Sequence, residues 1–102
     1  MYSTYVIEPS ETVCVYETST PILPETANNI VITNNGETTL KVMSYWAPPS
    51  GVWEELKEYT VPPYDTILVD STDSVFYYYE VTVTNLSKNI TGGALVIIEN
   101  DG

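Results

Sequence analysis

The chain has 102 residues, of which 14 are acidic and three are lysines, and it contains no histidine, so its formal net charge is −11. Such a charge repels phosphate, which excludes nucleic acid and anionic membrane surfaces as favoured partners. The length fits one domain with one apolar core and leaves no room for a second domain.

Thr, Val, Ile and Tyr dominate the composition, and the hydrophobic fraction of 43% comes mainly from residues that favour strands. We therefore expect an all-β fold, a single antiparallel β-sandwich of jelly-roll type with about six to eight strands and an extended N-terminal strand. The expected division is a leader at residues 1–17, a spacer at 18–27 and a sandwich domain at 28–102. No apolar run has the length of a membrane-spanning helix, and the first residues lack the basic and apolar regions of a secretory signal.

The leader contains two extended pieces separated by a turn at residues 8–11. Its second piece, Val13-Cys14-Val15-Tyr16, is apolar at every position, and such a strand needs cover on both faces. We expect these pieces to be the strand that docks during assembly. The predicted assembly strand consists of Tyr5, Val6, Ile7, Val13, Cys14, Val15 and Tyr16.

The spacer reads as a tether that starts at Thr18 and contains Pro21 and Pro24, neither of which can donate a backbone hydrogen bond to a sheet. Extended, the leader reaches roughly 50 Å and the spacer adds roughly 30 Å, more than one sandwich of about 20 to 25 Å needs. This reach favours docking on a neighbouring subunit by strand addition, which builds a filament. The alternative is a strand in its own sandwich, with a connection that crosses between sheets.

After the spacer, Asn34-Asn35-Gly36-Glu37 is the strongest turn signal and predicts a hairpin between strands at 30–33 and 39–46. Proline pairs at 48–49 and 62–63 break pairing on either side of a strand at 53–61. A second hairpin-like passage is expected to join that strand to residues 67–70.

The later strands show clearer patterns. In the strand expected at 77–85, Tyr77, Tyr79, Val81 and Val83 share one face and the alternate residues share the other. One of these faces is expected to face the core and the other the solvent. Residues 94–98 are apolar on both faces, so this last strand is expected to be central or covered. Two glycosylation sequons, at Asn85 and Asn89, fall in one predicted loop, and such triplets are frequent by chance in this composition.

No catalytic arrangement is apparent, and we expect that the protein is not an enzyme. A serine or cysteine nucleophile normally needs a neighbouring base, and histidine is absent. The carboxylate pairs Glu54-Glu55 and Asp70 with Asp73 resemble the two acids of a glycosidase, but in so acidic a chain they are more simply a solvated surface.

Metal sites are similarly restricted. Cys14 is the only cysteine, so neither an internal disulfide nor a cysteine-rich zinc site can form. We expect no cofactor, with calcium at Asp65, Asp70 and Asp73 as the one candidate ion, although their spacing matches no known calcium loop.

Four aromatic residues are candidate interface anchors: Tyr45, Trp53, Tyr64 and Tyr78. Tyrosine and tryptophan rings near the proline loops also suit a platform on which sugars stack. The simpler interpretation is that Trp46 fills the core and that the tyrosines cover sheet edges or subunit contacts.

The order of segments resembles the jelly-roll subunits of bacterial endospore appendages and similar surface filaments, with a cysteine-bearing connector, a spacer and a compact domain. Two strand-and-turn segments are similar to those of small sandwich domains in bacterial surface and virion proteins. They are Val31-Ile32-Thr33-Asn34-Asn35-Gly36 and Tyr59-Thr60-Val61-Pro62-Pro63. The resemblance implies a homopolymer at an extracellular, cell or spore surface. Appendage subunits use several cysteines for cross-links, whereas Cys14 has no second thiol to meet.

Three functions follow as hypotheses. The first is a structural subunit of an extracellular filament, made of copies of this chain and assembled head to tail by donation of the leader strand. The second is a virion decoration or tail module. The third is a small carbohydrate-binding β-sandwich, in which Trp53 contributes to the binding platform.

Overall fold

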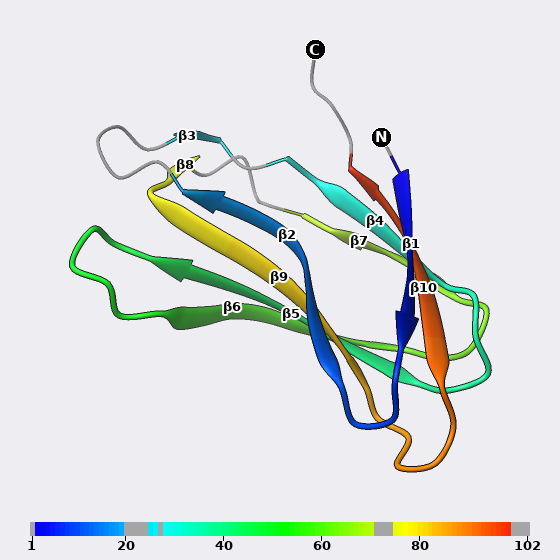
Figure 1. The fold of residues 1–102 in the computed structure, drawn as a ribbon. Coiled ribbons are helices and arrows are strands. Elements are labelled where there is room, and N and C mark those ends of the chain that lie inside the picture. Colours follow the sequence, from blue (N-terminus) through cyan, green and yellow to red (C-terminus); the bar gives the residue numbers. More distant parts are fainter. Residues whose placement is uncertain (1, 20–24, 27, 71–74, 99–102) are drawn as a thin grey trace.

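The computed structural model describes residues 2–19, 25–26, 28–70 and 75–98, and every regular element in these ranges is a β-strand (Figure 1). Eight longer strands form two four-stranded antiparallel sheets that pack as a sandwich, which confirms the predicted fold class. In the described part of the chain, no helix is long and apolar enough to cross a membrane.

Sheet A contains, in spatial order, β1 (Tyr2–Ile7), β10 (Gly92–Ile98), β4 (Ile30–Asn34) and β7 (Thr66–Val69). Sheet B contains β2 (Thr12–Ser19), β9 (Tyr78–Asn85), β5 (Leu40–Ala47) and β6 (Glu54–Val61). Two short strands, β3 (Glu25–Thr26) and β8 (Val75–Phe76), form a separate pair.

Consecutive long strands lie in opposite sheets, with the single exception of β5 and β6, which form a hairpin. This alternation is the jelly-roll topology. It places strands that are far apart in sequence side by side, such as β1 with β10 and β2 with β9 (Figure 1).

The core lies between the sheets and follows the predicted alternation. On β9, Tyr79, Val81 and Val83 are fully buried, and on β5 Leu40 and Val42 are also fully buried, with Val42 opposite Val83. Sheet A contributes the inward-facing residues Ile7, Ile30, Ile32, Val69, Ala94 and Val96. Burying these apolar side chains is the main stabilising contribution to a small sandwich.

The predicted hairpin at the Asn-Gly turn is wrong, because β4 lies in sheet A and β5 in sheet B. The buried Asn34 side chain donates hydrogen bonds to the carbonyl oxygens of Thr38 (2.7 Å) and Val61 (3.0 Å), which turns the chain across the sandwich. The passage from β6 to β7 is likewise a crossing between sheets, where Tyr64 adopts a positive φ of 65° and its N–H donates to the Asn34 carbonyl at 2.8 Å.

Within the one chain that the structure describes, both strands of the leader pair in their own sandwich, which is the arrangement given above as the alternative. β1 pairs with β10 along its whole length, and β2 pairs with β9. Ile7 and Val15 belong to the core cluster. The physical reason is topological, since a jelly roll needs these two strands to complete its two four-stranded sheets.

A β-bulge explains the apolar run in β2. Cys14 pairs with Thr82 and Tyr16 pairs with Val81, so Val15 is the extra residue. A bulge changes which residues face the core, and here Val15 is buried, Tyr16 packs against the core and Cys14 faces solvent. Cover on both faces is therefore not required.

Thr18, which was predicted to begin the tether, belongs instead to β2, where Thr18 and Ser19 lie opposite Tyr79 and Tyr78. Pro21 and Pro24 lie outside the described residues.

Candidate functional site

The outward surface of sheet A carries no charged residue. In each of its strands the inward positions hold core residues, so the alternate positions face away from sheet B. We call this surface the neutral face. Its residues are Tyr2, Thr4, Val6, Val31, Thr33, Thr66, Leu68, Gly93, Leu95 and Ile97.

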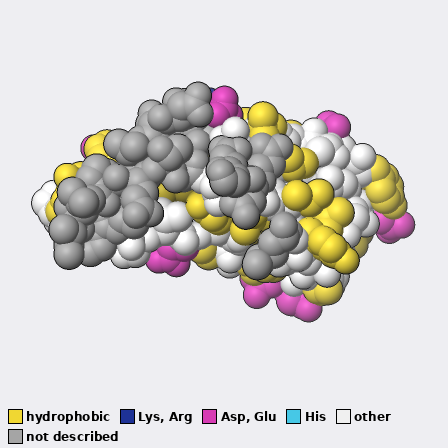
Figure 2. All heavy atoms as spheres, turned by 90° about the horizontal axis from the view of Figure 1, so that it is seen from above, with side chains coloured by type: hydrophobic (Ala, Val, Ile, Leu, Met, Phe, Trp, Pro, Cys, Tyr) yellow, Lys and Arg dark blue, Asp and Glu magenta, His cyan; other side chains and the backbone are white. Residues whose placement is uncertain are grey.

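Large apolar side chains on the neutral face are open to solvent. Tyr2 and Val6 are 73% and 74% exposed, Leu68 is 48% exposed and Ile97 is 38% exposed. In Figure 2, which views the molecule from above Figure 1, hydrophobic side chains form a patch at the right of the view and acidic side chains lie at the margins. Contiguous exposed apolar patches are uncommon on monomeric proteins and often have a functional role.

The last strand fits its sequence pattern in part. β10 is an inner strand of sheet A, between β1 and β4, as its doubly apolar sequence predicts. On its outer face, Ile97 is 38% exposed, whereas Leu95 is partly covered. The sequence therefore predicted the position of the strand but not an open face above it.

Three of the four candidate interface aromatics share the outer face of sheet B. Tyr45 and Tyr78 occupy outward positions of β5 and β9. Trp53, just before β6, contacts Tyr78 with a ring-centre distance of 6.2 Å and an angle of 59° between planes, and it is 44% exposed. We call Tyr45, Trp53 and Tyr78 the aromatic group.

Acidic side chains border the aromatic group, because Tyr45 pairs with Glu80 on one side and Glu55 on the other. The fourth predicted aromatic, Tyr64, is 70% exposed and lies elsewhere, in the turn between β6 and β7. Trp46 packs against the core, as the simpler interpretation expected.

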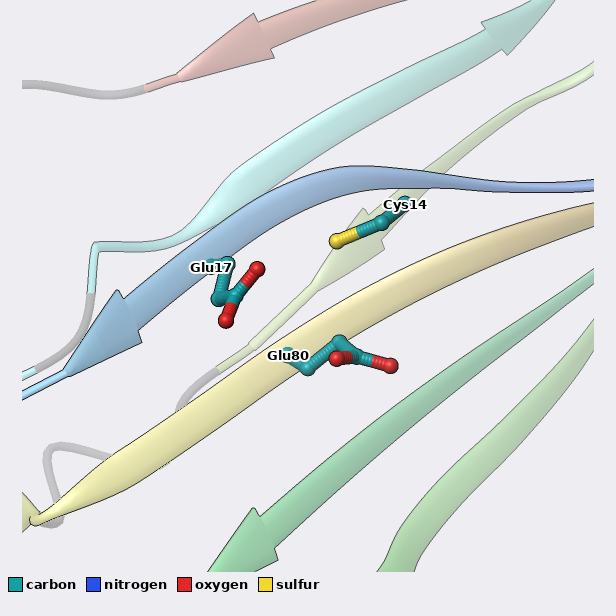
Figure 3. Close-up of side chains that lie close together, drawn as sticks. All are labelled: Cys14, Glu17 and Glu80. Atoms are coloured by element: carbon teal, nitrogen blue, oxygen red, sulfur yellow. The ribbon is translucent and has the colours of Figure 1, made fainter.

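Cys14 and Glu17 on β2 and Glu80 on β9 lie close together on the outer face of sheet B (Figure 3), with their thiol and carboxylate atoms all within 4.8 Å. Burial, and then the Glu17 charge, raises the pKa of Glu80. Burial, followed by the Glu80 charge, raises the pKa of the Cys14 thiol, which donates to the Tyr16 carbonyl at 3.4 Å. A protonated thiol is a poor nucleophile, so the raised pKa does not favour a nucleophilic role for Cys14 at neutral pH.

Comparison with known proteins identifies the family, since the model of the PirA-like family matches residues 2–94. The chain belongs to the PirA-like family. A crystal structure of PirA is similar to the PirA-like chain with a TM-score of 0.87 and 26% identity, covering 96% of this chain and 93% of that one. No curated protein matches the chain.

Two more distant structures share the fold of the PirA-like chain. The Yersinia pseudotuberculosis-derived mitogen matches with a TM-score of 0.64 and 11% identity, over 100% of this chain and 86% of that one. The cupin domain of Drosophila melanogaster CENP-C matches with a TM-score of 0.59 and 10% identity, over 97% of this chain and 60% of that one. The family is therefore PirA-like, and these similarities support the β-sandwich but not a relationship to endospore appendage subunits in particular.

The structure of the PirA-like chain separates the carboxylates that the sequence had suggested as groups. Asp65 and Asp70 lie at opposite ends of β7, about 16 Å apart along an extended strand, too far to share one calcium ion. Asp73 lies outside the described residues. Glu54 and Glu55 are consecutive in β6 and point to opposite faces of sheet B, so they do not face each other across a cleft.

Sequence reasoning missed the neutral face and the cluster around Cys14. Both depend on which strands are neighbours, because residues from β1, β10, β4 and β7 share one surface only in the jelly-roll order. The available signal was the absence of charge in every outward position of the last strand.

Proposed function

We propose that this PirA-like chain is a non-catalytic binding subunit that associates with a partner protein through the neutral face of sheet A. The observation that carries the proposal is an uncharged face with several exposed apolar side chains on a chain with a net charge of −11. Apolar contact supplies most of the affinity in such interfaces, while charge at the rim sets partner choice.

The charges around the neutral face favour a partner with a basic rim. Glu8 follows β1, and Asp65 and Asp70 flank β7, and all three are exposed. Lys41 and Lys57, by contrast, belong to sheet B. Two copies of the chain meeting face to face would bring their acidic rims together, so a protein with an apolar centre and basic surroundings fits the face better.

The proposal that the protein is not an enzyme has independent support. The sequence has no histidine to act as a base, and the paired carboxylates of β6 diverge.

The test uses the charge-introducing variants Val6→Lys and Leu68→Lys, which alter exposed positions of the neutral face, and Thr60→Lys as a control on an exposed position of sheet B. Proteins captured from the native source by the unmodified chain are purified and titrated individually against each variant. We expect binding that survives in Thr60→Lys and weakens at least about tenfold in the face variants. Equal binding by all variants would overturn the proposal.

The same variants test self-association, which the sequence favoured. Sedimentation of the chain alone over a range of concentrations and salt is expected to show a monomer. A dimer or polymer that the face variants dissociate would assign the neutral face to copies of this chain, and would overturn the heterologous partner.

A filament built by strand donation at an extracellular surface is the competing proposal from the sequence, and it predicts a polymer in the same sedimentation experiment. It is supported by the position of β1 and β2, which are edge strands of their sheets. Exchange of edge strands between copies is a known route to assembly. It requires both strands to leave the pairing described above.

A glycan-binding role is the second candidate, favoured by the aromatic group on the outer face of sheet B. Adjacent tilted rings, with Trp53 open to solvent and carboxylates nearby as acceptors, suit stacking against a sugar. On a glycan array, Trp53→Ala is expected to lose binding while Tyr64→Ala retains it. Absence of binding by the unmodified chain, or retention by Trp53→Ala, would remove this candidate.

A further inference from the structure

A depression of about 290 Å³ lies between the loop after β4 and the loop after β9, apart from the neutral face and the aromatic group. We call it the end pocket. It is lined by Glu37, Thr38, Thr39, Leu86, Ser87 and Ile90.

A buried asparagine fixes the first wall. The Asn34 side chain accepts a hydrogen bond from the Gly36 N–H at 3.1 Å and donates to the carbonyls of Thr38 and Val61. Its side chain is fully buried. The backbone that carries Glu37 is thereby held in one conformation.

A second buried asparagine fixes the other wall in the same way. Asn85 accepts from the Ser87 N–H at 2.9 Å and donates to the carbonyls of Ile90 (2.8 Å) and Ile7 (3.0 Å). The two walls are joined directly, since the Leu86 N–H donates to the Thr39 carbonyl at 3.1 Å. The pocket is therefore formed before any ligand arrives, which reduces the entropy lost on binding.

The lining combines aliphatic walls with acceptor groups. Leu86 is 47% exposed and Ile90 is 52% exposed, although both are apolar. Glu37 contributes an exposed carboxylate. Thr38 is 4% exposed, and its hydroxyl oxygen is buried against Gly92 of β10, so Glu37 is the side-chain acceptor that a ligand in the pocket can reach.

These groups select one class of ligand. No aromatic ring lines the pocket, which disfavours a stacked sugar, and no cationic side chain lines it, which disfavours an anion. An ammonium group on an aliphatic stem matches both features, because its donors meet the carboxylate while the methylene groups contact Leu86 and Ile90.

We propose that the end pocket binds an aliphatic primary ammonium group, supplied either by a lysine side chain of a partner protein or by a free alkylamine. The net charge of −11 attracts such a cation from a distance. Lys88 belongs to the second loop but is not among the lining residues. The site is independent of the neutral face, so either proposal can fail alone.

The test is an amide-resolved NMR titration of the full chain with n-butylammonium chloride, against sodium chloride at matched ionic strength. We expect saturable shifts at residues 37–39 and 86–90. Glu37→Gln is expected to weaken binding roughly fivefold. Two control variants are expected not to weaken it: Glu55→Gln, which alters an exposed acid of sheet B, and Lys88→Gln. n-Butanol, which has the stem without the charge, is expected not to saturate.

Further probes distinguish the two sources. Tighter binding of an Nα-acetyl-lysine amide than of 1,5-diaminopentane indicates a protein lysine, and the reverse order indicates a free alkylamine. Shifts spread over the acidic surface, unchanged affinity in Glu37→Gln, or equal binding of n-butanol would each overturn the proposal.

Discussion

Single buried asparagines connect the strands of this sandwich to its loops. Asn85 is fully buried and makes three hydrogen bonds, to Ile7, Ser87 and Ile90. Asn85→Ala leaves two carbonyls and one N–H without their partner, and we expect it to lower the free energy of unfolding by about 2 to 4 kcal/mol. Urea denaturation measures this loss.

The matched control for that substitution is Asn89→Ala, at an exposed position of the same loop. It is expected to change stability by less than about 0.5 kcal/mol. A loss of the same small size in Asn85→Ala would contradict the anchoring role.

Tyr79 is expected to make the folded state less stable at alkaline pH. Burial raises the pKa of its phenol to about 12 from an ordinary value of 10. The folded state therefore holds this proton more tightly than the unfolded state, so the contribution is complete below pH 10 and declines between pH 10 and 12, by about 2 kcal/mol in total. Thermal unfolding across this window measures the decline.

Tyr79→Phe removes the titrating group and keeps the ring, so its stability is expected to fall less steeply between pH 10 and 12. Tyr64→Phe, at an exposed turn, is the control and is expected to follow the unmodified chain. Parallel curves for Tyr79→Phe and the unmodified chain would exclude Tyr79 as the source.

For single residues, the sequence predicted which side chains face the core but not which residues they form hydrogen bonds with. Alternation in β9 correctly placed Tyr79, Val81 and Val83 in the core. Asn85, in contrast, fits a glycosylation sequon, yet its side chain is buried and hydrogen bonded. Three adjacent letters carry no information about Ile7, which lies 78 positions earlier and accepts one of its hydrogen bonds.

Among the strands, the N-terminal β1 offers the clearest test of how the sandwich is held together. β1 is an edge strand whose partner, β10, would lose one of its two neighbours without it. Removing residues 1–11 deletes β1 and the buried Ile7, so we expect a large drop in melting temperature or failure to fold. Circular dichroism with thermal unfolding measures the effect.

A synthetic peptide of residues 1–11 provides the complementary test, because added in trans it is expected to restore stability by occupying the vacant edge of β10. An unchanged melting temperature in the truncated chain would contradict the pairing within the chain and would favour a leader that docks on a neighbour.

Elements were easier to predict than their neighbours. The strands at 30–34, 40–47, 54–61 and 92–98 agree closely with the expected ones. The two predicted hairpins failed because Asn-Gly and Pro-Pro sequences specify that the chain turns, whereas the choice of sheet depends on contacts such as Asn34 with Val61. The same limit hid the neutral face, which exists only when four separate strands are in order.

For the whole molecule, unbalanced charge opposes compactness. The chain has fourteen acidic residues and only three lysines. Lys41 and Glu58 form an ion pair with a long contact of 4.0 Å, whereas Glu17 lies directly opposite another acid, Glu80. Like charges in such register are destabilising, and their repulsion is screened by salt. We therefore expect the melting temperature to rise by about 5 °C between 0.01 and 0.5 M sodium chloride.

Calorimetry at several salt concentrations measures how the melting temperature depends on salt. Glu80→Gln removes the charge opposite Glu17, so it is expected to raise the melting temperature at low salt and to weaken this salt dependence. Glu8→Gln, in an exposed turn, changes the net charge equally and is the control for the cross-strand contact. Calcium chloride at matched ionic strength is expected to act like sodium chloride, because Asp65 and Asp70 are separated by the length of β7. A melting temperature independent of salt would show that self-repulsion does not limit the stability of this sandwich.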